Sequence, residues 1–176
     1  MSFKLSCPIP NKIIISFSAG VDSVFGYHFL KNGGRDISLL HFNHATPMAN
    51  TYEQHTRLFA MTHGISLKVY QISGKNEAEW RDQRYDIIND LPAQVVTCHH
   101  LDDNIETQLM RKRDIPATNG NVIRPFLGVK KKAIYDYANQ HKLLWIEDPS
   151  NEIGFTKRNR IRNELLPLAK ELGINL

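Results

Sequence analysis

Residues 18–23 could bind phosphate, and they have the sequence Ser18-Ala19-Gly20-Val21-Asp22-Ser23. The run lies between an apolar segment and a segment with helical periodicity. Such a turn directs backbone N–H groups and the positive end of a helix dipole at one point, where anionic oxygen is favoured. The hydroxyls add donors and Asp22 can hold Mg²⁺, so we predict a phosphate-binding turn. The alternative is an ordinary strand-to-helix connection, which prefers the same residue types.

A second group of reactive side chains follows further along the chain: His99, His100, Asp102, Asp103 and Glu106. On a helix, carboxylates three or four residues apart share a face and repel each other unless a cation compensates. A local capping role for the acidic residues is the alternative. No further imidazole or thiolate with zinc-ligand spacing lies nearby, so Mg²⁺ bound with ATP is the favoured metal.

Hydrophobic periodicity indicates the elements that must position these side chains. Short apolar runs at residues 13–17, 37–42, 67–72 and 94–98 predict buried parallel strands, and helical periodicity follows each of them. The pattern predicts an α/β fold, a doubly wound and mostly parallel sheet with helices on both faces. In such sheets ligands bind beyond the carboxyl ends of the strands, where the strand order reverses. The important loops are therefore residues 18–23, 43–44 and 99–106.

Length and composition favour one domain over residues 1–176, because the 41% hydrophobic content suffices for one core. The two cysteines, Cys7 and Cys98, form no CxxC pair and suggest neither a zinc site nor a disulfide framework. No apolar run approaches the length of a membrane span. We expect a cytoplasmic protein with no membrane partner.

Charge is distributed unevenly along the chain. Residues 1–110 carry a net charge of −2, whereas residues 111–176 carry +6. A basic C-terminal third is typical of a surface that contacts phosphate backbones, so nucleic acid is the favoured partner. Residues 111–113 and 157–162 are the densest basic stretches, whereas residues 130–132 by themselves are also typical of a solvated face.

Several stretches, in order and over most of the chain, resemble the N-terminal domain of the tRNA(Ile)-lysidine synthetase family. The phosphate-binding turn alone resembles the wider group of N-type ATP pyrophosphatases, or PP-loop proteins. The more specific stretches are residues 99–107, with the pattern HHxDDxxET, and the tail from EDPSN at 147–151 to RNxIR at 158–162. Residues 41–44, 79–85 and 124–125 add to the likeness.

The resemblance implies an adenine-nucleotide α-hydrolase-like fold and a reaction in two steps on one base. The C2 oxygen of the wobble cytidine, in a CAU-anticodon isoleucine tRNA, attacks the α-phosphate of ATP and releases pyrophosphate. The ε-amine of free lysine then displaces AMP, which gives lysidine. ATP and Mg²⁺ are the implied cofactors and tRNA and free L-lysine the partners, while a homodimer is left open.

The resemblance and the charge pattern together assign roles to individual residues. The catalytic candidates are Asp22, Arg81, His99, Asp103 and Glu106. The ATP-binding candidates are Ser18, Ala19, Gly20, Val21, Asp22, Ser23, Asn43, His44 and His100, with Mg²⁺ held through ATP at Asp22. The tRNA-binding candidates are Arg111, Lys112, Arg113, Lys130, Lys131, Arg158, Arg160 and Arg162. On the last helix, Ile161, Leu165, Leu168 and Leu172 are expected to be core residues.

The chain departs from the family pattern at several places. Ala19 replaces the first glycine of the usual SGG, which would strain the loop if that residue needs a positive φ. Asn104 stands where the family has Gln, and residues 110–121 replace a glycine-rich loop. The C-terminal tRNA-binding domains of many members are expected to be absent from this chain, with a basic helical portion at about residues 129–176. Two alternatives stay open: another PP-loop enzyme that modifies tRNA, for example by thiolation, and a non-catalytic ATP- or RNA-binding relative.

Overall fold

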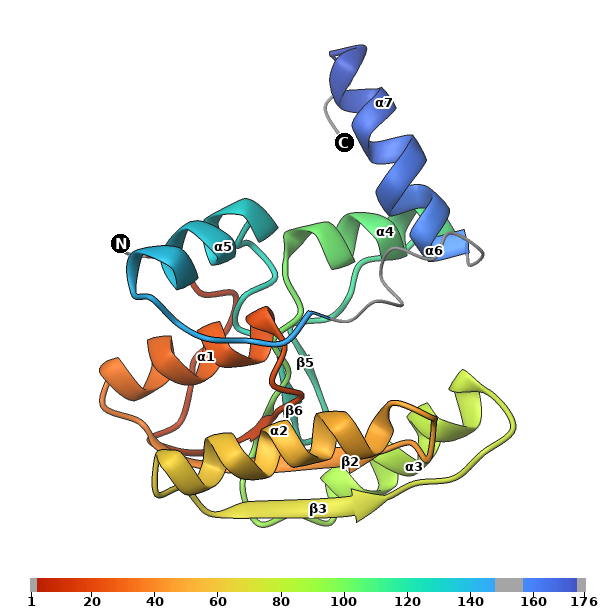
Figure 1. The fold of residues 1–176 in the computed structure, drawn as a ribbon. Coiled ribbons are helices and arrows are strands. Elements are labelled where there is room, and N and C mark those ends of the chain that lie inside the picture. Colours follow the sequence, from red (N-terminus) through yellow and green to blue (C-terminus); the bar gives the residue numbers. More distant parts are fainter. Residues whose placement is uncertain (1–2, 148–156, 174–176) are drawn as a thin grey trace.

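The computed structural model of the chain describes residues 3–147 and 157–173 (Figure 1). Its elements in chain order are β1 (Lys12–Ser16), α1 (Val21–Asn32), β2 (Asp36–Asn43), α2 (Ala49–Thr62), β3 (Leu67–Gln71), α3 (Glu77–Asn89), β4 (Val95–Val96), α4 (Leu101–Arg111), β5 (Thr118–Asn119), β6 (Val122–Ile123), α5 (Lys131–Gln140), α6 (Lys157–Arg160), the π-helical η2 (Ile161–Leu165) and α7 (Leu166–Glu171). Most of the EDPSN run lies outside the described residues. Within the described ranges, no helix is long and apolar enough to cross a membrane.

The six strands form one sheet in the order β3-β2-β1-β4-β6-β5. Neighbouring strands are parallel except for β5 and β6, which form a short antiparallel pair that the sequence did not predict. The predicted doubly wound, mostly parallel sheet is confirmed. Strand order reverses at β1, because β2 lies on one side of it and β4 on the other, so the loops that leave β1 and β4 become neighbours.

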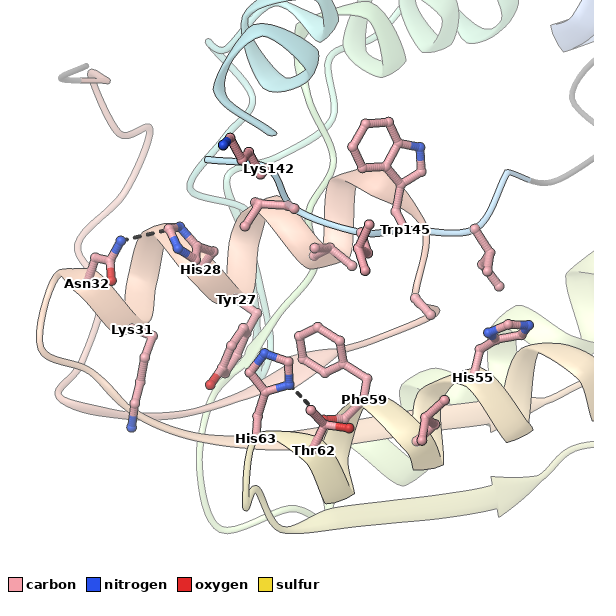
Figure 2. A pocket seen from close by; sticks show the side chains of 16 residues that line it. Tyr27, His28, Lys31, Asn32, His55, Phe59, Thr62, His63, Lys142 and Trp145 are labelled. Carbon is pink, nitrogen blue, oxygen red and sulfur yellow. Dashed lines mark hydrogen bonds between the residues drawn. The ribbon is translucent and has the colours of Figure 1, made fainter. Parts of the chain in front are cut away.

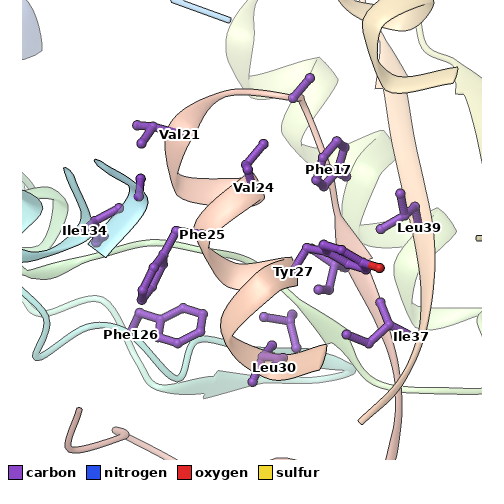
Figure 3. Close-up of a cluster of buried hydrophobic side chains, with 14 of the residues drawn as sticks. Phe17, Val21, Val24, Phe25, Tyr27, Leu30, Ile37, Leu39, Phe126 and Ile134 are labelled. Atoms are coloured by element: carbon purple, nitrogen blue, oxygen red, sulfur yellow. The ribbon is translucent and has the colours of Figure 1, made fainter. Parts of the chain in front are cut away.

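Alternate residues of β1, β2, β4 and β6 pack into two separate cores on opposite faces of the sheet. Ile13 and Ile15 of β1 join a large cluster with side chains of α1, α2 and α5 (Figure 3). Ile14 faces the smaller cluster, which contains Leu40 and, from α3, Ile88. This alternation follows from the two-residue period of a strand, and it places helices on both faces.

The backbone of α1 packs closely against Cys98, which follows β4 and precedes the histidine pair. A Cβ atom added at Gly26, in the middle of α1, would overlap the sulfur of Cys98 and touch the ring of Phe126. Cys98 directly precedes the loop that holds His99 and His100. Glycine at position 26 therefore lets the phosphate-binding turn and the histidine loop share one side of the molecule.

The last helix corrects one expectation from the sequence. Ile161, Leu165, Leu168 and Leu172 were expected in the core. Ile161 is half-buried, and for the three leucines the expectation is wrong, because their exposed fractions are 43%, 51% and 65%. The helix contacts α4 through α6 and η2, and its later part runs away from the body of the protein (Figure 1). An amphipathic pattern predicts an apolar face but not what covers it.

We expect the substitution Gly26→Ala to lower the free energy of unfolding by about 1 kcal/mol or more, because overpacking typically costs about 1–3 kcal/mol and exceeds the helix-propensity gain. The double variant Gly26→Ala/Cys98→Ala should recover most of the loss, since the overlapping sulfur is gone. Urea unfolding followed by circular dichroism measures both. A Gly26→Ala variant as stable as the parent chain would show that α1 can move away from β4 at no cost.

Candidate active site

The predicted phosphate-binding turn follows β1 and is held by short-range hydrogen bonds. The backbone N–H of Ser18 donates to the hydroxyl oxygen of Ser23 (3.3 Å), and that hydroxyl donates to the carbonyl of Gly20 (2.9 Å). Gly20 is the N-cap of α1 and has no side chain to cap the first turn. The N–H groups at this helix start therefore suit an external anion.

Ala19 has a φ of +60°, in the left-handed region that favours glycine. Its carbonyl accepts a hydrogen bond from the backbone N–H of Ile146 (3.0 Å), so the segment before residue 148 closes over the turn. Its methyl group is buried. The turn thus requires the positive φ that the family glycine would adopt without strain, and this chain accommodates an alanine there.

Asp22, in the first turn of α1, lies between two cationic or polar side chains from distant parts of the chain. Both of its carboxylate oxygens accept hydrogen bonds from the ammonium of Lys131, at 2.6 and 2.7 Å. The Nε2 atom of His100 lies 3.7 Å from Asp22 Oδ1 and 3.4 Å from Asp103 Oδ2. His100 thereby links the turn after β1 to the loop after β4.

Asp103 and Glu106 project from the first two turns of α4 toward arginines of the last helix. Glu106 is fully buried, and its oxygens lie 2.7 Å from Arg162 Nε and 3.1 Å from Arg158 Nε. Asp103 Oδ1 lies 3.6 Å from Arg162 Nη2, while Oδ2 accepts the backbone N–H of His100 at 3.0 Å. The capping role considered for the acidic residues is thus present at Asp103, in addition to its ion pair.

The charged groups shift each other's pKa values in this cluster. Burial alone would raise the pKa of Asp103, but the imidazoles of His100 and His99, the N–H of His100 and Arg162 together hold it below its usual range. Burial lowers the pKa of His99 to about 4, which outweighs the opposite effect of Asp103. Asp103 is therefore ionised and His99 neutral at pH 7.

A cationic cavity of about 620 Å³ adjoins this cluster, between α3, α4 and the segment that carries β5 and β6. Thr97 and His99, which follow β4, line this cavity, and His99 Nδ1 is 3.0 Å from Thr97 Oγ1. Its basic lining residues are Arg81, Arg84, Arg111, Arg113, Arg124, Lys157 and Arg158. So many guanidinium groups around one hollow suit an anionic ligand that carries phosphate or an electron-rich base.

A larger cavity of about 810 Å³ lies between α1, α2 and residues 142–146 (Figure 2). Its walls include Tyr27, Phe59 and Trp145, and of the predicted site residues it contains Ala19. Its lining residues include neither the carboxylates Asp22, Asp103 and Glu106 nor the arginines that line the smaller cavity. We therefore place the candidate active site at the smaller cavity and the turn after β1.

The family model that describes the PP-loop domain matches residues 5–169 of this chain. The chain belongs to the PP-loop family. Below, the predicted phosphate-binding turn at residues 18–23 is called the PP-loop. Among solved structures, an NH3-dependent NAD synthetase from Campylobacter jejuni has a TM-score of 0.51 at 14% identity, covering 90% of this chain and 78% of that one. A predicted subunit of a tRNA methyltransferase from Methanocaldococcus jannaschii has a TM-score of 0.51 at 18% identity, covering 74% and 76%. These two likenesses concern the fold.

Curated relatives of this PP-loop chain match most of its length. A bifunctional protein TilS/HprT from Listeria monocytogenes is 32% identical over 195 residues, covering 92% of this chain and 30% of that protein. A tRNA(Ile)-lysidine synthase from Pseudomonas aeruginosa is 32% identical over 179 residues, covering 87% and 40%. Another from Exiguobacterium sibiricum is 28% identical over 193 residues, covering 98% and 46%. The chain thus spans about a third to a half of the length of these relatives.

The remaining predicted residues differ in their contacts and exposure. The side chain of Asn43 is buried and donates to Glu53 (2.7 Å), and its oxygen accepts the N–H of Ala45 (2.9 Å). The His44 ring lies 5.2 Å from that of Trp80, and burial, assisted by Arg84, lowers the pKa of His44 to about 4. Exposed basic residues lie at the end of α4, before α5 and on α6: Arg111, Lys112, Arg113, Lys130 and Arg160.

Three residues at the site were not assigned there from the sequence. Arg124, which is buried, donates to the hydroxyl of Tyr85 (2.6 Å) and to the carbonyl of Pro116 (2.8 Å). Arg84 shares the cavity with Arg81, and their spacing of three residues on one helix was the signal available in the sequence. Lys131 was assigned to tRNA, and nothing in its run of three lysines indicated the contact with Asp22.

We expect Ala19→Gly to raise the free energy of unfolding, but by less than about 1 kcal/mol. Relief of the left-handed strain, worth about 1–2 kcal/mol, is partly offset by losing a buried methyl group, worth about 0.8 kcal/mol. Ala45, at φ +54° and exposed, is the matched control, and Ala45→Gly should gain more. Thermal and urea unfolding test this, and a destabilised Ala19→Gly variant would show that the methyl contact dominates.

We expect the stability of the chain to fall between about pH 6.5 and pH 4, in part because of His99. In that interval the unfolded chain protonates His99, whereas the folded state, with a pKa of about 4, does not, so the unfolded state binds more protons. His99→Gln should flatten this part of the stability profile and leave the slope above pH 7 unchanged. Urea unfolding at a series of pH values measures it, and identical slopes for both proteins would contradict the assignment.

Proposed function

We propose that this chain is the catalytic portion of an ATP-dependent tRNA-modifying enzyme that converts the wobble cytidine of a CAU-anticodon isoleucine tRNA to lysidine. The observation that carries the proposal is the meeting of the PP-loop with the HHxDDxxET helix, where His100 lies between Asp22 and Asp103. The relatives named tRNA(Ile)-lysidine synthase support the substrate and the ligase activity.

In the first step the C2 oxygen of the cytidine attacks the α-phosphate of ATP, and pyrophosphate leaves toward the PP-loop. The N–H groups at the start of α1, with Ser18 and Ser23, hold the departing phosphates. Mg²⁺, when bound with ATP, supplies neutralisation of phosphate charge. The Asp22 carboxylate fits that role, and within the described residues no group of three or more His, Cys, Asp or Glu could hold a metal by itself.

The cationic cavity is the proposed site of the target nucleotide. Arg81 and Arg124 line it, with His99 at its strand end, so an extruded base with its phosphates would meet positive charge there. The exposed basic residues at the end of α4, before α5 and on α6 extend that charge toward the rest of the tRNA. We propose that they contact its backbone.

In the second step the neutral ε-amine of lysine attacks C2 of the adenylated base, the C2–O bond breaks, AMP leaves with that oxygen, and the attacking nitrogen loses a proton to solvent water. We assign Asp103 to holding the incoming amine rather than to removing its proton, because a carboxylate with a lowered pKa is a poor base. Glu106 already lies between two guanidinium groups. Because these guanidinium groups already compensate Glu106, we assign the incoming amine to Asp103, whose Oδ1 lies further from Arg162 Nη2, at 3.6 Å.

A thiolation chemistry has less support in this chain. Sulfur transfer uses a reactive thiolate, and the thiol of Cys98 is packed against α1, where burial raises its pKa. Cys7, the other cysteine, is far from it in sequence and shares no CxxC motif.

The deciding experiment is incorporation of labelled lysine into a CAU-anticodon isoleucine tRNA transcript with ATP and Mg²⁺. We expect incorporation by the parent chain and a decrease of at least about 100-fold in Asp103→Asn, because a misplaced reacting group typically costs that much. The matched control is Asp136→Asn, which alters an exposed aspartate paired with Lys132 and should react normally.

No lysine incorporation, together with ATP consumption in the presence of another RNA or amine, would replace the proposal with a different tRNA modification. ATP or RNA binding without any turnover would favour a non-catalytic relative. Asp103→Asn activity equal to that of the parent chain would remove Asp103 from the reaction.

A further inference from the structure

Three consecutive lysines begin α5, and the structure gives them different surroundings. Lys130 is exposed and forms the N-cap, while Lys132 is exposed and pairs with Asp136 on the next turn (2.8 Å). Lys131 turns inward, where its ammonium reaches both oxygens of Asp22 and lies 5.2 Å from the ring centre of Tyr135. One lysine of the run is therefore part of the PP-loop site.

The position of this ammonium suits a phosphate ligand. Asp22 is the second residue of α1, so Lys131 Nζ lies beside the first turn of the helix whose N–H groups we assign to pyrophosphate. Asp22 is also the carboxylate that fits Mg²⁺, and a hard cation requires the carboxylate oxygens that Lys131 contacts. Binding of Mg²⁺ with ATP would therefore compete with the Lys131 contact.

The other cations nearby are committed to different carboxylates. Arg158 and Arg162 pair with Glu106, and Arg162 also lies near Asp103. Lys131, once displaced from Asp22, has a flexible four-carbon stem and a compact charge with three donors. Its nearest source of negative charge would then be the phosphates held at the start of α1.

We propose that Lys131 is an ATP-binding residue that serves as the resident counter-ion of Asp22 and transfers its ammonium to the pyrophosphate portion of ATP when Mg²⁺ binds. This inference rests on the ATP use in the proposed function. It gives Lys131 a role different from that of Lys130, for which tRNA contact remains the prediction.

The test compares Lys131→Met, Lys131→Arg and Lys132→Met with the parent chain by equilibrium titration of ATP in the presence of Mg²⁺ and the absence of tRNA. We expect Lys131→Met to weaken ATP binding about tenfold or more, Lys131→Arg to retain most of the affinity, and Lys132→Met to bind as the parent chain does. In a lysine-incorporation assay the Lys131→Met change should appear mainly in KM for ATP. Circular dichroism and thermal unfolding verify that each variant is folded.

A second titration, of tRNA without ATP, separates this role from tRNA contact. Lys131→Met should bind tRNA as the parent chain does. Unchanged ATP affinity in a folded Lys131→Met variant would overturn the inference, as would a loss of affinity for tRNA alone. If the parent chain bound no ATP, the proposed function and this inference would both fail, whereas ATP binding that Lys131→Met does not alter would remove only the inference.

Discussion

Three carboxylates converge at one side of the sheet, and their need for positive charge organises the rest of the site. Asp22 enters with the helix after β1, and Asp103 and Glu106 enter with the helix after β4. Each meets a cation from the last third of the chain: Lys131 for Asp22, and Arg158 and Arg162 for the other two. Without these partners the fully buried Glu106 would be a costly isolated charge, because removing one member of a buried pair typically costs several kcal/mol.

These ion pairs give part of the basic C-terminal third a role other than contact with nucleic acid. From its net charge, the segment is typical of a nucleic-acid surface. In the structure it divides into two sets, since Lys131, Arg158 and Arg162 turn toward carboxylates, while residues such as Arg113 and Lys130 remain exposed. Arg158 and Arg162 also anchor the start of the last helix to α4. The ion pairs therefore link the chain's C-terminal helix to the chemistry of its site.

Close packing brings these groups within reach of one another. The backbone of α1 approaches Cys98 closely because residue 26 has no side chain, and the positive φ of Ala19 lets the PP-loop turn sharply into α1. His100 completes the arrangement, because it is the N-cap residue of α4 and its ring faces two carboxylates.

The sequence by itself determined the parallel sheet, the PP-loop and the cluster on α4, because those features depend on local periodicity and on motifs of a few adjacent residues. It also indicated that Ala19 would be strained if its φ were positive. Only the tertiary structure decided which cation meets which carboxylate, since Lys131 and Asp22 are 109 residues apart and no local pattern distinguishes Lys131 from its two neighbours. The exposure of Leu165, Leu168 and Leu172 was likewise decided by the fold, because periodicity gives a helix an apolar face without specifying what lies against it.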